Sequence, residues 1–319
     1  MLINKTMEIK VFIIIVTYNA MKWLDKCLQS IDCSSIKTNV VIIDNASTDE
    51  TVKHIRNNYP KVHLIANEKN RGFGQANNQG IEFAYKNRAT NFFLLNQDAY
   101  IHEDTVEKLV AVQNENDIAL VSPIHLNGRG ESLDYNFYRK TIINEDNIEF
   151  VSDAILGKEK NYYSVFKINA AAWMLSRRCV EKIGGFDPIY FHYGEDGNYC
   201  QRLKYHNEQC VFVPCAYIQH DRIRQGNMTV YKKNHTIMQL LYAYTDVNYS
   251  PWRVRLSKLT MHGSHFKRSL YALFTFHFKD LGTIVGGYIE FFKKIPFIKH
   301  SLTVNRKQGA AWLDLEYKD

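Results

Sequence analysis

Hydrophobic residues recur along the first 120 residues in two alternating patterns. Short unbroken apolar runs, typical of strands buried on both faces of a sheet, alternate with stretches whose apolar positions have helical spacing. The runs expected as strands are VFIIIV (11–16), NVVIID (39–44), KVHLIA (61–66), NFFLLN (91–96) and DIALVSP (117–123). The stretches expected as helices are 21–31, 47–59, 73–87 and 103–114. This alternation predicts βαβ units and an α/β fold with a mostly parallel sheet flanked by helices.

The pattern changes after this alternating region. Residues 124–164 are polar and irregular, and we interpret them as an inserted loop or a small hairpin layer. Apolar runs then predict a strand over 164–175 and another over 210–220, with a helix from about Gly194 between them. From about residue 231 onward helical spacing predominates, which predicts a helical C-terminal extension.

Polar residues follow the predicted strands at the points where the strands end. They are Thr17-Tyr18-Asn19, Asp44-Asn45, residues 67–74 and Asn96-Gln97-Asp98. Because ligands of open α/β sheets bind beyond the carboxyl ends of the strands, this edge predicts a binding crevice. Asp44 is an acceptor-only group there, suited to a base N–H or a ribose hydroxyl. Ser47 is expected to cap the helix that follows.

The segment NRGFGQAN (70–77) opens a predicted helix after a strand. Gly72 and Gly74 form a G-x-G, and Asp98 lies 24 residues beyond Gly74, which partly matches the dinucleotide-binding fingerprint. An NAD-dependent dehydrogenase is therefore an alternative, although Asn77 replaces the third glycine and the loop follows the third strand. Otherwise the segment suits a phosphate or a sugar at a helix N-terminus, or an ordinary tight turn.

Two sets of polar side chains are candidates for chemistry. Asn96 and Asp98 offer hard oxygen atoms two residues apart, and such atoms together with diphosphate oxygens commonly hold Mg²⁺ or Mn²⁺. Glu195 and Asp196 follow the run Tyr190-Phe191-His192-Tyr193. These surroundings raise the pKa of a carboxyl group and suit a general base, but two acids entering a helix also suit its dipole.

The composition is that of a folded protein, since 45% of the 319 residues are hydrophobic and 23% are charged. The N-terminal run VFIIIV is too short for a signal peptide, and no stretch has the roughly 18 uncharged apolar residues of a membrane span. The six cysteines form no CxxC pair, so we expect reduced thiols and no zinc site. A cytoplasmic location is therefore expected.

The net charge of +7 is concentrated in one segment. Residues 251–306 contain ten lysines and arginines against Asp280 and Glu290, a net charge of +8, and aromatic residues are interleaved with them. This combination predicts helices on an anionic membrane surface, which would place the protein peripherally on the inner face of a membrane. A helical subdomain packed on the rest of the chain, or a dimer interface, would explain the same pattern. No nucleic-acid-binding motif is present, so no nucleic acid partner is expected.

Five segments taken together resemble glycosyltransferase family 2, whose members have the GT-A fold, and in particular its rhamnosyltransferase-like enzymes of bacterial surface-polysaccharide assembly. The matching segments are IVTYN (15–19), IIDNASTD (42–49), NRGFGQANNQGI (70–81), LLNQDAYI (94–101) and GGFDPIYFHYGEDGNYCQRL (184–203). The resemblance implies a Rossmann-like GT-A catalytic domain over 1–225, with a nucleotide-binding half at about 10–123 and an acceptor half at about 124–225. Residues 226–319 would form the basic, aromatic-rich helical region.

The resemblance also implies a reaction. A sugar would move from a nucleoside-diphosphate donor, dTDP- or UDP-linked, to a hydroxyl of a glycan or lipid-linked acceptor in bacterial polysaccharide biosynthesis. A single base on the face opposite the leaving group implies displacement with inversion. A divalent cation, Mn²⁺ or Mg²⁺, would stabilise the leaving diphosphate. A non-catalytic sugar-nucleotide binding protein is a further alternative.

Positions that match the family motifs receive roles by resemblance. The residues that would border the nucleotide-sugar donor are Thr17, Asp44, Asn70, Gly72, Asn77, Asn96 and Asp98, with Thr17 and Asp44 at the nucleoside. The metal ligands would be Asp98, at the final acid of the DxD motif, and His220. The catalytic pair would be Asp196 as general base and Glu195 as a residue that positions the base or the acceptor.

The chain departs from the family pattern at two positions. Asn96 replaces the first acid of DxD, as is common among the rhamnosyltransferase-like members, which predicts weaker metal binding. Asn198 replaces an aspartate that relatives often carry after the Glu-Asp pair, which bears on the acceptor geometry. Trp173 would either floor the sugar pocket or belong to the core.

Overall fold

The computed structural model describes residues 8–143, 147–222, 228–249 and 251–316. Within these ranges, nine strands form one sheet in the order β3-β2-β1-β4-β8-β6-β9-β5, with the short β7 paired to β9. The strands are β1 (Val11–Thr17), β2 (Thr38–Asp44), β3 (His63–Ala66), β4 (Asn91–Asn96), β5 (Ala99–Ile101), β6 (Leu120–Asn127), β7 (Tyr163–Ser164), β8 (Ala172–Ser176) and β9 (Cys210–His220). The strands β3-β2-β1-β4 run parallel, as do β6 and β9, whereas β8 is antiparallel to both of its neighbours. The predicted α/β class is confirmed.

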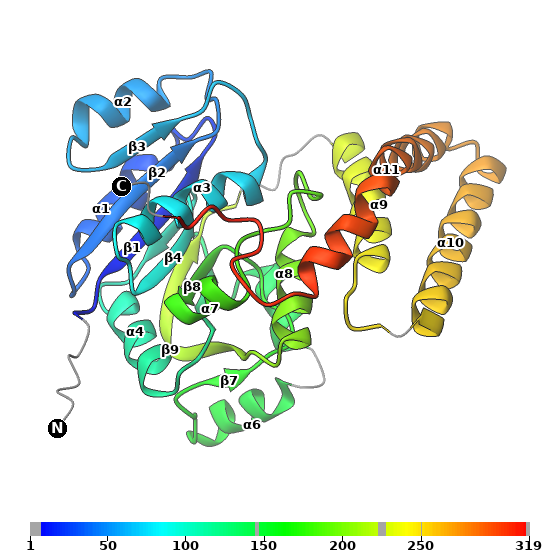
Figure 1. Cartoon of the computed structure of the whole chain (residues 1–319). Helices are drawn as coiled ribbons and strands as arrows, with labels where there is room; N and C mark the ends of the chain where they lie inside the picture. Colours follow the sequence, from blue (N-terminus) through cyan, green and yellow to red (C-terminus); the bar gives the residue numbers. More distant parts are fainter. Residues whose placement is uncertain (1–7, 144–146, 223–227, 250, 317–319) are drawn as a thin grey trace.

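Helices cover both faces of the sheet (Figure 1). They are α1 (Leu24–Asp32), α2 (Thr51–Asn58), α3 (Phe73–Lys86), α4 (Thr105–Glu115), α5 (Tyr135–Phe137), the π-helix η1 (Tyr138–Ile142), α6 (Ile148–Leu156), α7 (Arg177–Lys182), α8 (Glu195–Tyr205), α9 (Met228–Tyr244), α10 (Pro251–Phe274) and α11 (Phe278–Asn305). In α1 the buried residues Leu24, Cys27, Leu28 and Ile31 have the spacing of one helix face, and they pack on the sheet together with α4. Helices α3, α7 and α8 contribute to the hydrophobic cluster on the opposite face.

The register of the parallel strands aligns the polar strand ends. Thr17 at the end of β1 is paired with Asp44 at the end of β2, and Val16 is paired with Asn96 of β4. At the other side of the sheet, Ala99 of β5 is paired with His220 of β9. The residues that end separate strands therefore meet at one edge, which is the edge where the sequence predicted a crevice.

Residues 124–164 differ from the predicted loop or hairpin layer, since they contain α5, η1, α6 and β7. Asp134 stabilises this turn of the chain because its Oδ1 accepts hydrogen bonds from the backbone N–H groups of Asn136 and Phe137. The Phe137 side chain is fully buried and packs edge-on against Phe212 of β9. The predicted strand over 164–175 is shorter than expected, since its regular part begins at Ala172.

The prediction of Ser47 as a helix cap is wrong. Helix α2 begins only at Thr51, and its N-cap position is occupied by Glu50 without a side-chain hydrogen bond. The Ser47 hydroxyl instead donates to Asp44 Oδ1 and accepts from the backbone N–H of Asn19. A serine beside a buried carboxylate gains a stronger, charge-assisted bond there than at a helix terminus.

The predicted helical C-terminal region is present as α9, α10 and α11. Helices α9 and α11 pack on each other and on the segment before α8 through a hydrophobic cluster of Ile189, Tyr190, Leu240, Leu241, Phe291 and Ile298. Helix α10 forms the outer edge of this region in Figure 1. Among the helices that the structure describes, none combines the length and apolar character required to cross a bilayer.

After α11 the chain returns to the α/β part, seen in Figure 1 as the red segment that runs back toward α3. The carbonyl of Ala311 accepts a hydrogen bond from the Gly185 N–H, and Leu313 and Leu315 pack against the core cluster beneath α3 and α7. Asp187 joins the two parts, since its Oδ2 accepts from Ser301 Oγ and Asn305 Nδ2 of α11. Residues 306–316 thus belong spatially to the α/β part.

Candidate active site

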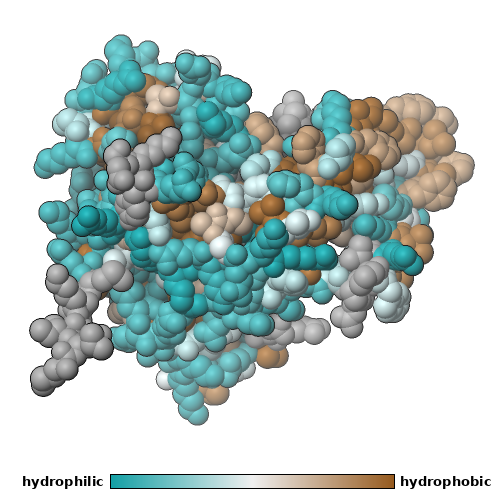
Figure 2. Space-filling model, viewed as in Figure 1, coloured by the Kyte–Doolittle hydropathy of each residue, from teal (hydrophilic) through white to brown (hydrophobic). Residues whose placement is uncertain are grey.

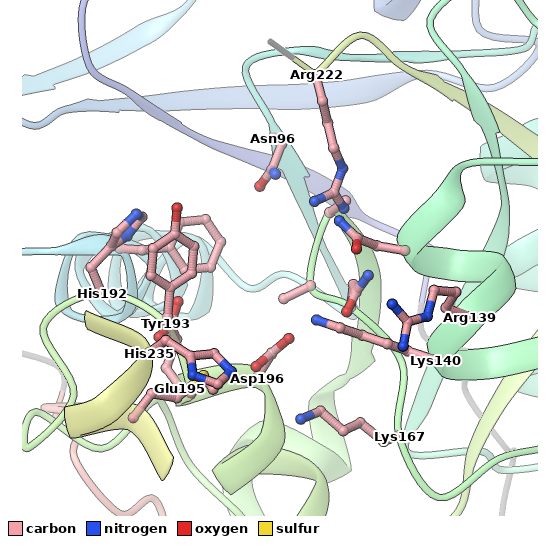
Figure 3. A pocket seen from close by; sticks show the side chains of 17 residues that line it. Asn96, Arg139, Lys140, Lys167, His192, Tyr193, Glu195, Asp196, Arg222 and His235 are labelled. Atoms are coloured by element: carbon pink, nitrogen blue, oxygen red, sulfur yellow. The ribbon is translucent and has the colours of Figure 1, made fainter. Parts of the chain in front are cut away.

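A cavity of about 520 Å³ lies at the carboxyl edge of the sheet (Figure 3). Its lining comes from the end of β4, the segment α5–η1, the residues before β8, the start of α8, the residue Arg222 after β9, and α9. The labelled lining residues in Figure 3 are Asn96, Arg139, Lys140, Lys167, His192, Tyr193, Glu195, Asp196, Arg222 and His235. Of the predicted site residues, the structure brings Asn96, Glu195 and Asp196 to this one cavity.

Glu195 and Asp196 have different surroundings. Glu195 is buried, and its Oε2 has no hydrogen-bond partner, so loss of water and the neighbouring Asp196 charge raise its pKa to about 8. Asp196 is half-buried, and its carboxylate extends into the cavity in Figure 3. Its Oδ1 accepts from the Gly197 N–H at the first turn of α8. At neutral pH this arrangement holds a proton on Glu195, which leaves Asp196 as the acceptor group.

The predicted G-x-G loop packs on protein rather than facing an open groove. Gly72 has φ +82°, and a Cβ at this position would lie 2.1 Å from the carbonyl oxygen of Phe191. A Cβ on Gly74 would lie 2.8 Å from Cβ of Phe186. The two glycines therefore serve the close approach of the 186–191 segment, which carries the acids of α8. A dinucleotide pyrophosphate has no access to these positions, and the dehydrogenase alternative loses its structural basis.

Thr17 and Asp44 are both buried at the ends of adjacent strands. Asp44 Oδ1 accepts from the Thr17 hydroxyl at 2.9 Å, and its Oδ2 accepts from the Ser47 N–H at 2.9 Å. Neither residue lines the cavity that contains Asp196. The carboxylate thus fixes the loop between β2 and α2 beside the crevice.

The loop after β3 is held to the same edge by amide side chains. Asn45 Oδ1 accepts from the Arg71 N–H, and Asn45 Nδ2 donates to Asn70 Oδ1. Asn70 Oδ1 also accepts from the Gly72 N–H at 2.8 Å. Asn77 is buried within α3 and donates to the Phe73 carbonyl. These bonds shape the loop, and the Asn77 side chain does not reach the cavity.

Asp98 and His220 are in contact at the end of β9, with Asp98 Oδ1 3.3 Å from His220 Nε2. Arg222 Nε donates to His220 Nδ1 at 3.2 Å, and the same nitrogen lies 3.2 Å from Asp134 Oδ2. With Nδ1 as acceptor, Nε2 of His220 carries a proton and donates to Asp98. His220 becomes free to ligate a cation through Nε2 only when that proton leaves and Arg222 releases Nδ1.

The donor set around Asp98 fits a cation that takes most of its ligands from a bound substrate. Within the described ranges, no three His, Cys, Asp or Glu side chains cluster in a way that would enclose a metal ion. The Oδ1 atom of Asn96 is buried without a hydrogen-bond partner. Asp98 is 20% exposed at its side chain and supplies a hard oxygen. One carboxylate, one amide oxygen and diphosphate oxygens form a suitable set for Mg²⁺ or Mn²⁺.

Sequence reasoning missed a set of residues on the far wall of the cavity. Arg139 and Lys140 come from η1, and Lys167 and Asn169 come from the segment before β8. Desolvation lowers the pKa of Lys140, and the charges of Lys167 and Arg222 lower it further against the opposing effect of Asp196. These residues lie in segments whose apolar positions have neither helical nor strand periodicity, so the sequence pattern did not indicate them. Trp173 is fully buried and stacks on Phe186, which makes it a core residue.

Comparisons of the sequence with a family model and with known proteins agree on one class of enzyme. The family model described as "Glycosyl transferase family 2" matches residues 12–184. The low-salt glycan biosynthesis hexosyltransferase Agl10 of Haloferax volcanii is 24% identical over 222 residues, which are 68% of this chain and 70% of Agl10. The dTDP-rhamnosyl transferase RfbF of Shigella flexneri is 27% identical over 121 residues, covering 38% of this chain and 40% of RfbF.

Solved structures share the fold at low sequence identity. S. aureus TarS residues 1–349 superpose with a TM-score of 0.58 at 14% identity, covering 93% of this chain and 89% of that one. The mannosyltransferase PcManGT from Pyrobaculum calidifontis, in complex with GDP-Man and Mn²⁺, has a TM-score of 0.56 at 15% identity, covering 90% of this chain and 88% of that one. The predicted GT-A architecture is thereby confirmed.

Proposed function

The chain belongs to glycosyl transferase family 2 and is a glycosyltransferase of glycan biosynthesis, and we propose that Asp196 is the general base of an inverting transfer from a nucleoside-diphosphate sugar. One observation carries this proposal. The Asp196 carboxylate extends into the cavity at the carboxyl edge of the sheet, while the adjacent Glu195 is buried and holds its proton at neutral pH. A base must lie within hydrogen-bond reach of the proton that it takes, and Asp196 is the open carboxylate at this wall.

In the proposed reaction the acceptor hydroxyl lies beside Asp196 and attacks the anomeric carbon of the donor sugar. Asp196 takes the hydroxyl proton as the new C–O bond forms and the bond from the anomeric carbon to the diphosphate oxygen breaks. The nucleoside diphosphate leaves toward the Asn96 side of the cavity, opposite the base. Because attack and departure occur on opposite faces, the anomeric configuration inverts.

Asp98, Asn96 and, after release by Arg222, His220 would hold a divalent cation, Mn²⁺ or Mg²⁺. Such a cation supplies positive charge to the diphosphate and so favours its departure. Arg222 contributes a permanent positive charge to the same wall. The titles of related structures support this assignment, since PcManGT binds GDP-Man with Mn²⁺ and TarS binds UDP-GlcNAc.

Thr17, Asp44 and the loop bordered by Asn70 and Gly72 would hold the nucleoside and its ribose. The Asp44 carboxylate already accepts hydrogen bonds from Thr17 and Ser47. It would therefore either orient the loop that contacts the nucleoside, or exchange one of these hydrogen bonds for one from the nucleoside. The partial match to a dTDP-rhamnosyl transferase supports a dTDP- or UDP-linked donor. The acceptor would be a glycan or lipid-linked glycan in bacterial polysaccharide biosynthesis.

The test measures nucleoside-diphosphate release from UDP-, dTDP- and GDP-sugars with Mn²⁺, together with product configuration by NMR. We expect one donor class to be turned over, an inverted anomeric configuration, and loss of turnover with EDTA. Asp196→Asn is expected to lower kcat by about 10²- to 10⁴-fold, whereas the exposed Asp32→Asn serves as control and leaves it unchanged. Retained configuration, or an Asp196→Asn variant with full activity, would contradict the proposal.

We also propose that the α10–α11 end binds an anionic membrane surface and brings the enzyme to a lipid-linked acceptor. Figure 2 shows hydrophobic residues gathered over this end of the molecule. At its tip four aromatic side chains are 58% to 77% exposed: Tyr271, Phe274, Phe276 and Phe278. Lys267, Arg268 and Lys279 flank them and are also exposed. Aromatic residues beside cations suit insertion among anionic headgroups.

This second proposal is tested by co-sedimentation of the full chain with vesicles of phosphatidylglycerol and phosphatidylethanolamine, against vesicles of phosphatidylcholine alone. We expect binding only to the anionic vesicles, weakened about tenfold or more in F274S/F276S because two exposed rings that would insert into the bilayer are lost. The matched control is I155S/L156S on α6, which removes two equally exposed apolar residues elsewhere. Equal loss in both variants, or binding to neither vesicle, would overturn it.

A further inference from the structure

The wall of the cavity opposite Asn96 is strongly positive. Arg139, Lys140 and Lys167 line it, and within the residues that the structure describes none of the three has a carboxylate within 4.0 Å. The Lys167 ammonium group lies over the Tyr242 ring at 4.9 Å, and Arg139 contacts the Tyr135 hydroxyl and ring. Burial favours the protonated form of Glu195, so the negative charges that act on Lys140 are those of Asp196 and Asp134.

The cations lie on the side of the cavity where the acceptor must bind. A Cβ added to Gly197, the residue after Asp196, would lie 2.7 Å from the Lys167 ammonium nitrogen, so this group sits at the first turn of α8. In Figure 3 the side chains of Lys140 and Lys167 both extend toward Asp196, whereas Asn96 and Arg222 lie at the other side. Because the base must reach the acceptor hydroxyl, groups beside Asp196 contact the acceptor.

A buried amide of the same cavity has no partner among the residues that the structure describes. Asn169 lines the cavity and is 6% exposed, and within that part of the chain neither its Oδ1 nor its Nδ2 has a hydrogen-bond partner. A buried amide left unpaired costs roughly 1 to 3 kcal/mol, which a bound ligand with hydroxyl or oxyanion groups recovers. The lysines and the amide together form a polar site that is satisfied only when a ligand is present.

We propose that the acceptor of this glycosyltransferase carries an anionic group, a phosphate or a carboxylate, next to the hydroxyl that receives the sugar. The inference rests on the proposed function, because it takes Asp196 as the base. Lys140 and Lys167 bind the anionic group, Arg139 reaches it from η1, and Asn169 bonds an adjacent hydroxyl. The anionic group of the acceptor neutralises the positive charges of the lysines and the arginine, which otherwise repel one another in a partly desolvated cavity.

Two other roles for Arg139, Lys140 and Lys167 predict different experimental results. Cations that served only the donor diphosphate would change donor affinity equally for every acceptor. Cations that served only to keep Asp196 ionised would change kcat and its pH profile without altering the preference among acceptors. A preference for charged acceptors is therefore the specific consequence of the proposal.

The experiment compares acceptor pairs that differ only in charge, in the presence of Mn²⁺ and the donor that the enzyme turns over. One arm uses glucuronoside against glucoside oligosaccharides, and the other uses oligosaccharides with and without a glycerol-phosphate substituent. Transfer kinetics and equilibrium binding by calorimetry are measured for wild type, K140A/K167A and the control K53A/K61A. The control removes two exposed lysines that do not line the cavity, Lys53 in α2 and Lys61 between α2 and β3.

We expect wild type to prefer the anionic member in at least one arm by about tenfold or more in KM and Kd, since a charged hydrogen bond contributes roughly that factor. The preferred arm identifies phosphate or carboxylate. K140A/K167A is expected to lose the preference, while K53A/K61A keeps it. Equal affinity for both members in both arms, or a preference that survives in K140A/K167A, overturns the inference. Transfer to the neutral acceptors, and its loss in Asp196→Asn, reports the proposed function separately, because neither depends on the charge of the acceptor.

Discussion

Glu195 and Asp196 are consecutive at the start of α8, yet Glu195 is 7% exposed with an unpartnered Oε2 while Asp196 turns its carboxylate into the cavity. Glu195 packs where its backbone approaches Gly74, since a Cβ on that glycine would lie 3.8 Å from the Glu195 Cβ. Glu195 is thus part of the packing between α3 and α8, whereas Asp196 is available for chemistry.

The first prediction concerns the stability contributed by Glu195. Its folded-state pKa of about 8 lies above that of an unfolded chain, so the folded protein binds the proton more tightly. The stability of the wild-type protein relative to Glu195→Gln is therefore independent of pH below about pH 4. As the pH rises toward 8, this relative stability decreases by a few kcal/mol in total. Urea unfolding at pH 5, 7 and 9 measures this difference. A constant difference across this pH range would contradict the buried, protonated state.

Gly72 is predicted to be intolerant of any side chain. Gly72→Ala combines a positive φ with a Cβ placed against the Phe191 carbonyl, so we expect a loss of about 2 to 4 kcal/mol. Gly157→Ala is the matched control, because Gly157 also has a positive φ but has open space around its Cβ position. It should cost about 1 kcal/mol. Chemical unfolding of both variants gives the comparison, and equal losses would show that the contact with Phe191 is unimportant.

Asp44→Ala is predicted to destabilise the crevice edge. The change leaves the Thr17 hydroxyl and the Ser47 N–H without their acceptor in a buried setting, which costs roughly 2 to 4 kcal/mol. Thermal unfolding against the exposed control Asp32→Ala measures the effect. Nucleotide binding, followed by thermal shift with UDP or dTDP and Mn²⁺, should weaken in the same variant. An unaffected melting temperature would mean that these two bonds are dispensable.

Asn169→Ala should separate stability from function. Both polar atoms of Asn169 are already unpaired, so removing them is expected to leave stability unchanged or increased by about 1 kcal/mol while KM for the acceptor rises. Gln113→Ala gives the opposite pattern, since Gln113 is buried and bonded to Asn91 and the Met174 carbonyl. It should lose about 2 to 3 kcal/mol without a specific effect on KM. Matching stability losses in the two variants would place Asn169 among the structural residues.

The sequence allowed prediction of the parts that depend on local periodicity. Unbroken apolar runs such as VFIIIV and NVVIID are typical of strands buried on both faces of a parallel sheet, and their pairing in register then brings Thr17 to Asp44. The cavity wall formed by Arg139, Lys140 and Lys167 depends instead on how short irregular segments fold over the sheet. Nothing in their spacing encodes that arrangement.

The glycines of the 70–77 segment illustrate a second limit. Their sequence pattern suggests room for a phosphate, but the space beside Gly72 is filled by the backbone at Phe191, more than one hundred residues later. A local glycine pattern indicates that another group approaches the backbone closely, but it does not identify that group. Ser47 shows the same limit, since its partner Asn19 comes from a different strand end.

The return of residues 310–315 to the core has a consequence for how the protein is made. Leu313 and Leu315 pack against the core cluster to which α3 and α7 contribute, and those two helices leave the ribosome more than one hundred residues earlier. During synthesis the apolar surface that the two leucines cover therefore stays exposed until they emerge. We expect nascent chains that stall before this point to be open to chaperones and proteases, which makes the C-terminal segment the last part to complete the core.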